Sequence, residues 1–192
     1  MIRFFCRLLS KLWCDYLRSF WSRIRWCGKR KIAGKEVTEK VTNTLTSVRN
    51  MCKEVYSKFE WTMDGPTQLF DSLRPCEYLY NWYKDSTKEK PLKDDCDGYH
   101  SLIYHILQAN GFDCCIITII TNPMTKSHAM TLYKYNGDTY LVNYTSVKKY
   151  TNCTVQEIVN DYNKGNGFKK EYYWNTQRYD YKKKVFYNER NF

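Results

Sequence analysis

The sequence predicts an α+β protein, with helices in the first half and an antiparallel sheet in the second. Three observations support this. Apolar residues recur at helical spacings of three or four up to residue 108. A β-branched run over 114–121 indicates a buried strand. Asn136-Gly137 then separates two further apolar runs and is the strongest short signal for a hairpin.

The first 27 residues predict an amphipathic helix. Its apolar positions are Phe5, Leu9, Leu12, Tyr16, Phe20 and Ile24, widened by Leu8, Trp13, Leu17 and Trp21. Basic residues interrupt each apolar run, so neither a membrane-spanning helix of about 20 apolar residues nor a signal peptide is expected. Two arrangements fit: a helix in a membrane interface, or one packed on a partner protein or on the chain's own domain.

The following elements are predicted in order along the chain. After a basic linker at 28–34 come a helix over 36–57, an extended piece over 57–62, a turn at 64–66, a short helix over 67–73, a helix from Pro75 to Trp82 or Tyr83, and a loop over 85–93. A helix over 96–108 then ends at Asn110-Gly111. The expected organisation is an appended helix with its linker, residues 1–31, and one domain, residues 36–192.

The second half predicts strands over 114–121, 127–135 and 139–144. Thr154 and Glu157 form a capping box that begins a further helix. The tail, 169–192, adds one or two strands. Its Tyr- and Lys-rich run over 181–187 is typical of a solvated edge strand more often than of a nucleic-acid site.

Charge and cysteine usage limit the partners and the compartment. Residues 1–40 hold 11 of the 31 Lys and Arg and 3 of the 20 Asp and Glu, a net charge of +8, which leaves +3 for the rest. This concentration argues against nucleic acid and favours an anionic membrane surface or a protein partner for residues 1–31. Nine scattered Cys without a CxxC pair suit a reducing compartment, so we expect a cytoplasmic protein, with membrane-peripheral attachment as one option.

Cys96, His128 and Asn143 form the candidate catalytic set. Cys96 stands where a polar loop becomes a helix, and a helix N-terminus favours a thiolate. With Asn136-Gly137 as a two-residue turn, opposed positions sum to 273, so His128 and Asn143 are diagonal neighbours on one face of the hairpin. A base within reach of the thiol and a third group that orients the base are what nucleophilic catalysis needs.

Three segments carry a resemblance to a known superfamily: Asp94-Asp95-Cys96-Asp97-Gly98 with the helix that follows, Ser127-His128-Ala129-Met130, and Tyr140-Leu141-Val142-Asn143-Tyr144-Thr145. Over about residues 57–147 the chain resembles transglutaminase-like and papain-like thiol enzymes. The resemblance implies a Cys at the N-terminus of a central helix packed on an antiparallel sheet. It also implies a Cys-His-Asn triad acting on peptide or amide bonds, with no cofactor and no metal.

The chain departs from that pattern at four positions. Asp94 replaces a common Gly, Gly98 an acid, Asn143 the orienting Asp, and Tyr144 a Pro. Asn still accepts a hydrogen bond from an imidazole N–H, as in papain-like enzymes. The oxyanion donors would be the Cys96 backbone N–H and one upstream group, for which Trp61 and Trp82 are the candidates.

Two functions are therefore predicted. The first is a cysteine peptidase or transglutaminase-like acyltransferase with a protein or peptide substrate; peptidase, transamidase and deamidase all fit. The second is an inactive protein of the same fold that docks through its N-terminal helix. Simpler interpretations also exist: an inert Cys96, a structural His128, a strand residue at Asn143, helix-start acids at 94, 95 and 97, and a Cys96–His100 metal pair.

Overall fold

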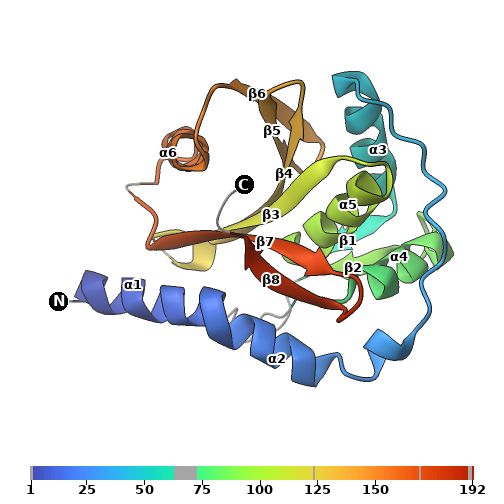
Figure 1. Ribbon diagram of the computed structural model, residues 1–192, viewed down its shortest axis with the longest axis horizontal. Helices are drawn as coiled ribbons and strands as arrows, with labels where there is room; N and C mark the ends of the chain where they lie inside the picture. The colour runs from blue at the N-terminus through green and yellow to red at the C-terminus, as the bar shows by residue number, and fades with distance from the viewer. Residues whose placement is uncertain (1, 63–72, 123, 169, 190–191) are drawn as a thin grey trace.

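The computed structural model describes residues 2–62, 73–122, 124–168, 170–189 and 192. It confirms a mixed α+β protein. Its main sheet is antiparallel throughout, with strand order β6-β5-β4-β3-β7-β8, and a short parallel pair, β1-β2, lies apart from it (Figure 1). The turn predicted at 64–66 and nearly all of the short helix predicted over 67–73 fall outside the described residues.

The N-terminal segment is helical, as predicted, and is packed on the chain's own domain. Helix α1 (Ile2–Leu12) continues through a π-helical turn, η1 (Trp13–Leu17), into α2 (Arg18–Arg25), and a 3-10 turn, η2 (Lys29–Lys31), follows. These helices run beneath β7 and β8 (Figure 1). The residues that the domain buries are Ser10, Cys14, Arg18 and Ser22, one in each turn, so a mainly polar stripe faces the sheet.

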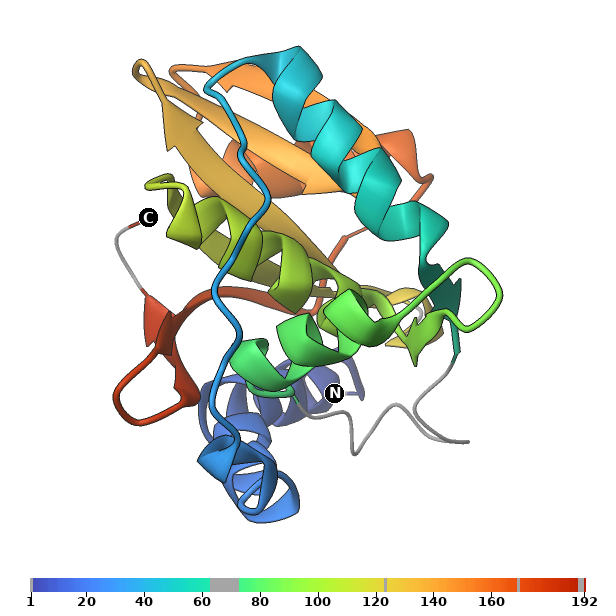
Figure 2. The same ribbon diagram turned by 90° about the vertical axis from the view of Figure 1, so that its right-hand side faces the viewer.

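The next helix is shorter than the 36–57 that periodicity predicts. Helix α3 spans Leu45–Ser57, and the Thr44 side chain caps it by accepting from the Ser47 N–H at 3.1 Å. The preceding residues cross α4 and α5 as an extended strap (Figure 2). Its backbone N–H groups donate to side chains on those helices, from Thr38 to Tyr80 and from Val41 to Asn110. These tertiary hydrogen bonds replace the helical ones, and the prediction for 36–44 was wrong.

The elements around the predicted nucleophile lie close to their expected positions. Strand β1 is Phe59–Trp61, helix α4 is Cys76–Asp85 with Pro75 as its N-cap, and α5 is Cys96–Ala109. The end of the predicted loop over 85–93 is instead strand β2 (Leu92–Asp94), which pairs in parallel with β1. Because this pairing is non-local, a polar three-residue segment gave no strand signal.

The central hairpin has the predicted register. Strands β3 (Asp113–Ile120), β4 (His128–Tyr135) and β5 (Asp138–Asn143) are consecutive, with a 3-10 turn at Met124–Lys126. Tyr135 opposes Asp138, and Thr131 opposes Val142, so opposed positions sum to 273. Asn136 and Gly137 both have positive φ, 50° and 81°, as a type I′ turn requires.

The remaining elements complete both sides of the sheet. Strand β6 (Ser146–Thr151), which the sequence analysis did not predict, forms one edge. The capping box of Thr154 and Glu157 begins α6 (Val155–Gly165), as predicted. The tail supplies β7 (Tyr173–Asp180) and β8 (Val185–Glu189). The predicted edge strand over 181–187 is therefore a turn up to Lys184, and only its last three residues belong to edge strand β8.

The sheet is covered on both faces. Helices α3, α4 and α5 pack with Ile116 and Val142 on one face, while α6 packs with Ile117 and Leu141 on the other. Neighbouring residues of β3 thus enter opposite cores, which explains its continuous apolar sequence. Helix α5 is enclosed so fully that every residue from Asp97 to Leu107 is buried.

We predict that the buried histidines make the fold acid-sensitive. Burial lowers the pKa of His105 from 6.5 to about 4. Below pH 6.5 this histidine is protonated in the unfolded chain but not in the folded chain. The free energy of unfolding therefore falls by about 1.4 kcal/mol per pH unit for each such group, until the pH reaches the pKa of the folded state. His105→Gln should therefore reduce the slope of the unfolding free energy against pH, between pH 6.5 and 4, by about 1.4 kcal/mol per pH unit, which corresponds to one proton.

Urea unfolding at several pH values measures this slope. Tyr181→Phe is the matched control, because it removes the hydroxyl 2.9 Å from His105 Nδ1 but keeps the titrating ring. Equal slopes for wild type and His105→Gln would contradict the prediction.

Candidate active site

Cys96 is the first residue of α5 and is partly buried. The Asp95 side chain caps this helix by accepting from the Asp97 N–H at 3.2 Å. The positive end of the helix dipole therefore lies at the thiol. The chain places Cys96 where a thiolate would be stabilised, as the sequence predicted.

Two arginines pair with acids beside Cys96. Arg18, from the N-terminal helices, lies 3.4 Å from Asp97, with both side chains 3% exposed, and its Nη1 donates to Thr118 Oγ1 at 2.9 Å. Arg74 forms an ion pair with buried Asp94. These cations offset negative charge that would otherwise disfavour a thiolate at Cys96. Sequence reasoning missed both arginines, although Arg18 belongs to the polar stripe at every fourth position.

Asp94 and Gly98 lie in close steric contact. A Cβ added to Gly98 would overlap the Asp94 carboxylate. The absent side chain at 98 thus makes room for the acid at 94, which sits against Arg74. Gly98 and Asp94 therefore fit each other sterically in this chain.

His128 and Asn143 are brought together as predicted. The two residues lie at the open end of the β4–β5 hairpin, opposite its turn, and His128 Nε2 donates to Asn143 Oδ1 over 2.9 Å. This bond fixes the tautomer that leaves Nδ1 unprotonated. Burial lowers the pKa of His128 below its usual value, and the hydrogen bond that it donates to Asn143 offsets part of that shift. The imidazole is therefore neutral at pH 7 and can accept a proton.

His100 holds the neighbouring backbone in place. Its Nδ1 donates to Thr131 Oγ1 at 3.1 Å, and its Nε2 accepts from the Tyr144 N–H at 3.4 Å. Tyr144 has a φ of 50°, an unfavourable conformation for a residue with a side chain. Both ring nitrogens of His100 are thus engaged, which argues against its pairing with Cys96 on a metal. No three His, Cys, Asp or Glu side chains converge on a metal-binding geometry within the described part of the chain.

Two tyrosines, Tyr144 and Tyr162, lie beside the His128 ring. The His128 ring centroid lies 5.4 Å from that of Tyr144 and 6.1 Å from that of Tyr162, which it stacks on at 19°. Burial, and next the proximity of Cys96, raise the pKa of Tyr162 to about 12. The same two causes, in the same order, raise the pKa of Tyr144. His128, Tyr144 and Tyr162 thus form one cluster, and the Cys96 thiol lies within electrostatic range of its two tyrosines.

Of the two tryptophans considered as oxyanion donors, Trp61 lies closer to this cluster. It pairs with Asp94 across the β1–β2 ladder, two residues before Cys96, and its side chain hydrogen-bonds Tyr144. Trp82 instead stacks near Arg74, with 5.9 Å from its ring centroid to the guanidinium carbon. Trp61 is also 49% exposed, so its face is open to an incoming substrate.

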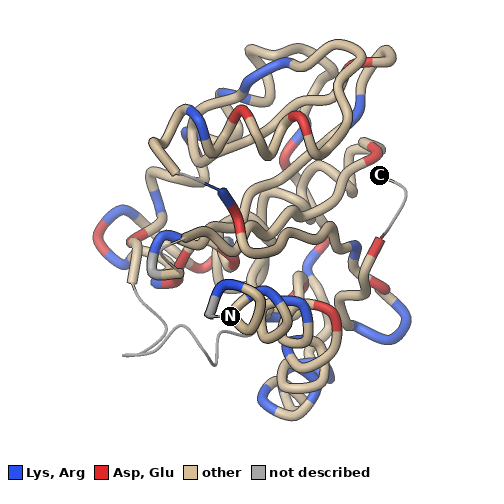
Figure 3. The backbone as a smooth tube through the Cα atoms, turned by 90° about the vertical axis from the view of Figure 1, so that its left-hand side faces the viewer, with Lys and Arg blue, Asp and Glu red and all other residues tan. Residues whose placement is uncertain are grey.

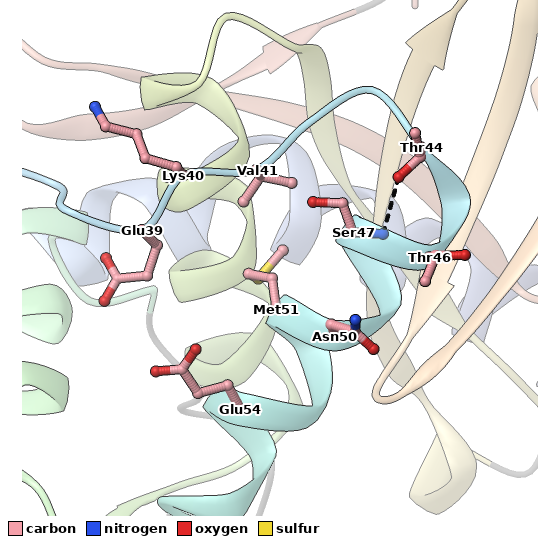
Figure 4. Close-up of a pocket in the computed structure, with 9 residues that line it drawn as sticks. All are labelled: Glu39, Lys40, Val41, Thr44, Thr46, Ser47, Asn50, Met51 and Glu54. Carbon is pink, nitrogen blue, oxygen red and sulfur yellow. Dashed lines mark hydrogen bonds between the residues drawn. The ribbon is translucent and has the colours of Figure 1, made fainter.

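Two hollows lie on the described surface. One of about 190 Å³, between β5, β6 and α6, is lined in part by Asn143 and Tyr162 and so reaches the cluster. A larger one of about 400 Å³ lies between the extended strap and α3 (Figure 4). None of the three predicted catalytic residues lines the larger hollow, and its Glu39 is already bonded to Tyr80 and Lys84. The smaller hollow is lined by one of the three, Asn143, and by neither Cys96 nor His128.

Comparison with protein-family models, with curated protein sequences and with solved structures finds no match to this chain. The α+β architecture and the His128–Asn143 contact therefore rest on this chain's own structure.

We predict that Gly98→Ala destabilises the protein by about 1–3 kcal/mol, although Ala is the better helix former, because its methyl group meets the buried Asp94 carboxylate. Gly165→Ala is the control, since a Cβ there meets nothing within 4 Å. Chemical denaturation compares the two. A Gly98→Ala protein as stable as Gly165→Ala would refute the steric argument.

We also predict that Arg18→Met costs about 3–5 kcal/mol, the usual penalty for removing one partner of a buried ion pair. The matched control is Arg23→Met on exposed α2, expected to change stability by under about 0.5 kcal/mol. Denaturant midpoints decide between them, and equal stability of both variants would show that Asp97 does not depend on Arg18.

Proposed function

We propose that the protein is a thiol enzyme with a papain-like or transglutaminase-like core, in which Cys96, His128 and Asn143 form the catalytic triad. The observation that carries this proposal is the 2.9 Å hydrogen bond from His128 to Asn143 Oδ1, which joins the predicted base to its orienting residue across the β4–β5 hairpin. A protein or peptide amide is the expected substrate, and cleavage or acyl transfer the expected reaction.

The chemistry follows from the protonation states. His128 Nδ1 takes the proton from Cys96 Sγ, and the thiolate attacks the amide carbonyl carbon. Asn143 keeps Nε2–H aligned while the imidazolium exists. The imidazolium returns the proton to the leaving amine as the C–N bond breaks, which leaves a thioester on Cys96. Water or an acceptor amine then attacks the thioester and releases the thiol.

Charge on the carbonyl oxygen needs donors near Cys96. The backbone N–H of Cys96, at the start of α5, supplies one, because N–H groups in the first turn of a helix do not bond to a carbonyl of the same helix. The indole N–H of Trp61 is the second donor in our proposal, and it would exchange its bond with Tyr144 for one with the substrate. The hollow lined by Asn143 and Tyr162 would take part of the acyl chain.

The decisive experiment is iodoacetamide labelling at pH 7, followed peptide by peptide. Burial raises the pKa of the competing thiols Cys52, Cys76, Cys114 and Cys115, so they should react slowly. We expect Cys96 to react at least about tenfold faster than exposed Cys27, because a helix N-terminus and a neighbouring imidazole favour its thiolate. His128→Ala should abolish this advantage.

His105→Gln is the control for that substitution, because it removes a buried histidine on the same helix as Cys96 without touching the triad. Labelling of Cys96 at the rate of Cys27, in wild type as in His128→Ala, would refute the nucleophile assignment and favour a protein that keeps this fold without the chemistry. Substrate profiling of wild type against Cys96→Ala would then define the amide that is cleaved or transferred.

A further inference from the structure

The N-terminal helices are oriented opposite to an ordinary surface helix. Their mainly polar stripe is buried on the domain, whereas the apolar stripe faces outward. Nine large apolar residues lie on this outer face, with exposed fractions of 43–74%: Phe4, Phe5, Leu8, Leu9, Leu12, Tyr16, Leu17, Phe20 and Ile24. We call these nine residues the outer stripe. A contiguous apolar surface of this extent marks an interaction site.

Specific polar bonds hold the helices in this orientation. Both carboxylate oxygens of Asp15 accept from the Tyr173 hydroxyl at 2.8 Å, and Asn188 donates to the Asp15 carbonyl at 3.1 Å. On the next turn, Arg18 is buried against Asp97 and Thr118. Rotating the helices to bury the outer stripe would break all of these contacts. The polar contacts with the domain therefore keep the apolar face outward.

The charge of this segment selects the partner. Residues 1–35 contain ten Lys and Arg and a single acid, Asp15, which is turned to the domain. Basic positions recur along the helices and the turn after them (Figure 3). Two copies of this face would repel each other, whereas an anionic surface would be attracted. The exposed basic side chains lie within about a helix diameter, 10–12 Å, of whatever covers the stripe, and at this distance salt does not fully screen their charge.

The length and composition fit a bilayer surface. The helices run continuously over Ile2–Arg25, or about 36 Å at 1.5 Å per residue. Aromatic and leucine side chains on one side with basic residues on the other are typical of helices that lie in the interface. Within the residues that the structure describes, no helix is long and apolar enough to cross a bilayer, so the segment would lie along the surface.

We propose that the outer stripe is a docking surface for an anionic lipid bilayer. Helices α1 and α2 lie flat in the interface, with their apolar side chains among the acyl chains and their basic side chains at the headgroups. The domain then stands on the bilayer in one orientation, since Asp15 and Arg18 fix it to the helices. This proposal does not depend on the chemistry of Cys96.

Co-sedimentation of the full chain with vesicles tests it. One set contains phosphatidylcholine alone, and the other equimolar phosphatidylcholine and phosphatidylserine. Wild type should pellet with the anionic set and be released by high salt. The triple variant Phe5→Ser, Leu9→Ser, Phe20→Ser should lose at least about tenfold in partitioning, because three side chains no longer enter the acyl region. Arg7→Glu with Lys11→Glu should lose the preference for anionic vesicles.

The matched control is Tyr181→Ser with Tyr187→Ser, two residues that are 38% and 44% exposed on the β7–β8 end of the sheet. It should pellet like wild type. Circular dichroism and urea unfolding show that each variant is folded, and neither measurement depends on the triad. Equal pelleting of wild type and the triple variant would overturn the proposal. The proposal would also be overturned if the protein did not bind vesicles but formed a dimer that the triple variant lost. That result would assign the outer stripe to contact with a second copy of the chain.

Discussion

Three buried carboxylates surround the first residue of α5, and much of the structure is arranged around two of them. Asp94 and Asp97 are each 2% exposed, and a buried charge without a partner would be very costly. Their arginines come from distant segments, Arg74 before α4 and Arg18 from the N-terminal helices. The charge requirement at one helix start therefore fixes the placement of both segments and leaves Cys96 between neutralised acids.

The hairpin supplies the other half of the candidate site by a different route. A type I′ turn at Asn136-Gly137 sets the register, and the register alone places His128 and Asn143 diagonally. His100, on α5, then holds the Tyr144 backbone in its left-handed conformation. The helix that carries the thiol thus also braces the strand end that carries Asn143, so the three candidate residues depend on one packed interface.

The N-terminal helices contact Asp97, beside Cys96, on one side and present an apolar surface on the other. Their inward contacts are polar and specific, whereas their outward surface is apolar and lined with basic residues. Helices usually bury the apolar side, because burial of apolar area is the main stabilising term in folding. Here the domain has a complete core without that side, built from the clusters on the two faces of the sheet.

The sequence by itself determined the local features: the helix beginning at Cys96, the capping box at Thr154, the hairpin register, and from it the meeting of His128 with Asn143. Each depends on neighbours in the chain or on one tight turn. Only the tertiary structure decided the ion pairs of Arg18 and Arg74, the fit of Gly98 to Asp94, strand β2, the extended strap over 36–44, and the outward face of the N-terminal helices. These depend on contacts between residues distant in sequence, and a helical period shows that a face is apolar without showing what covers it.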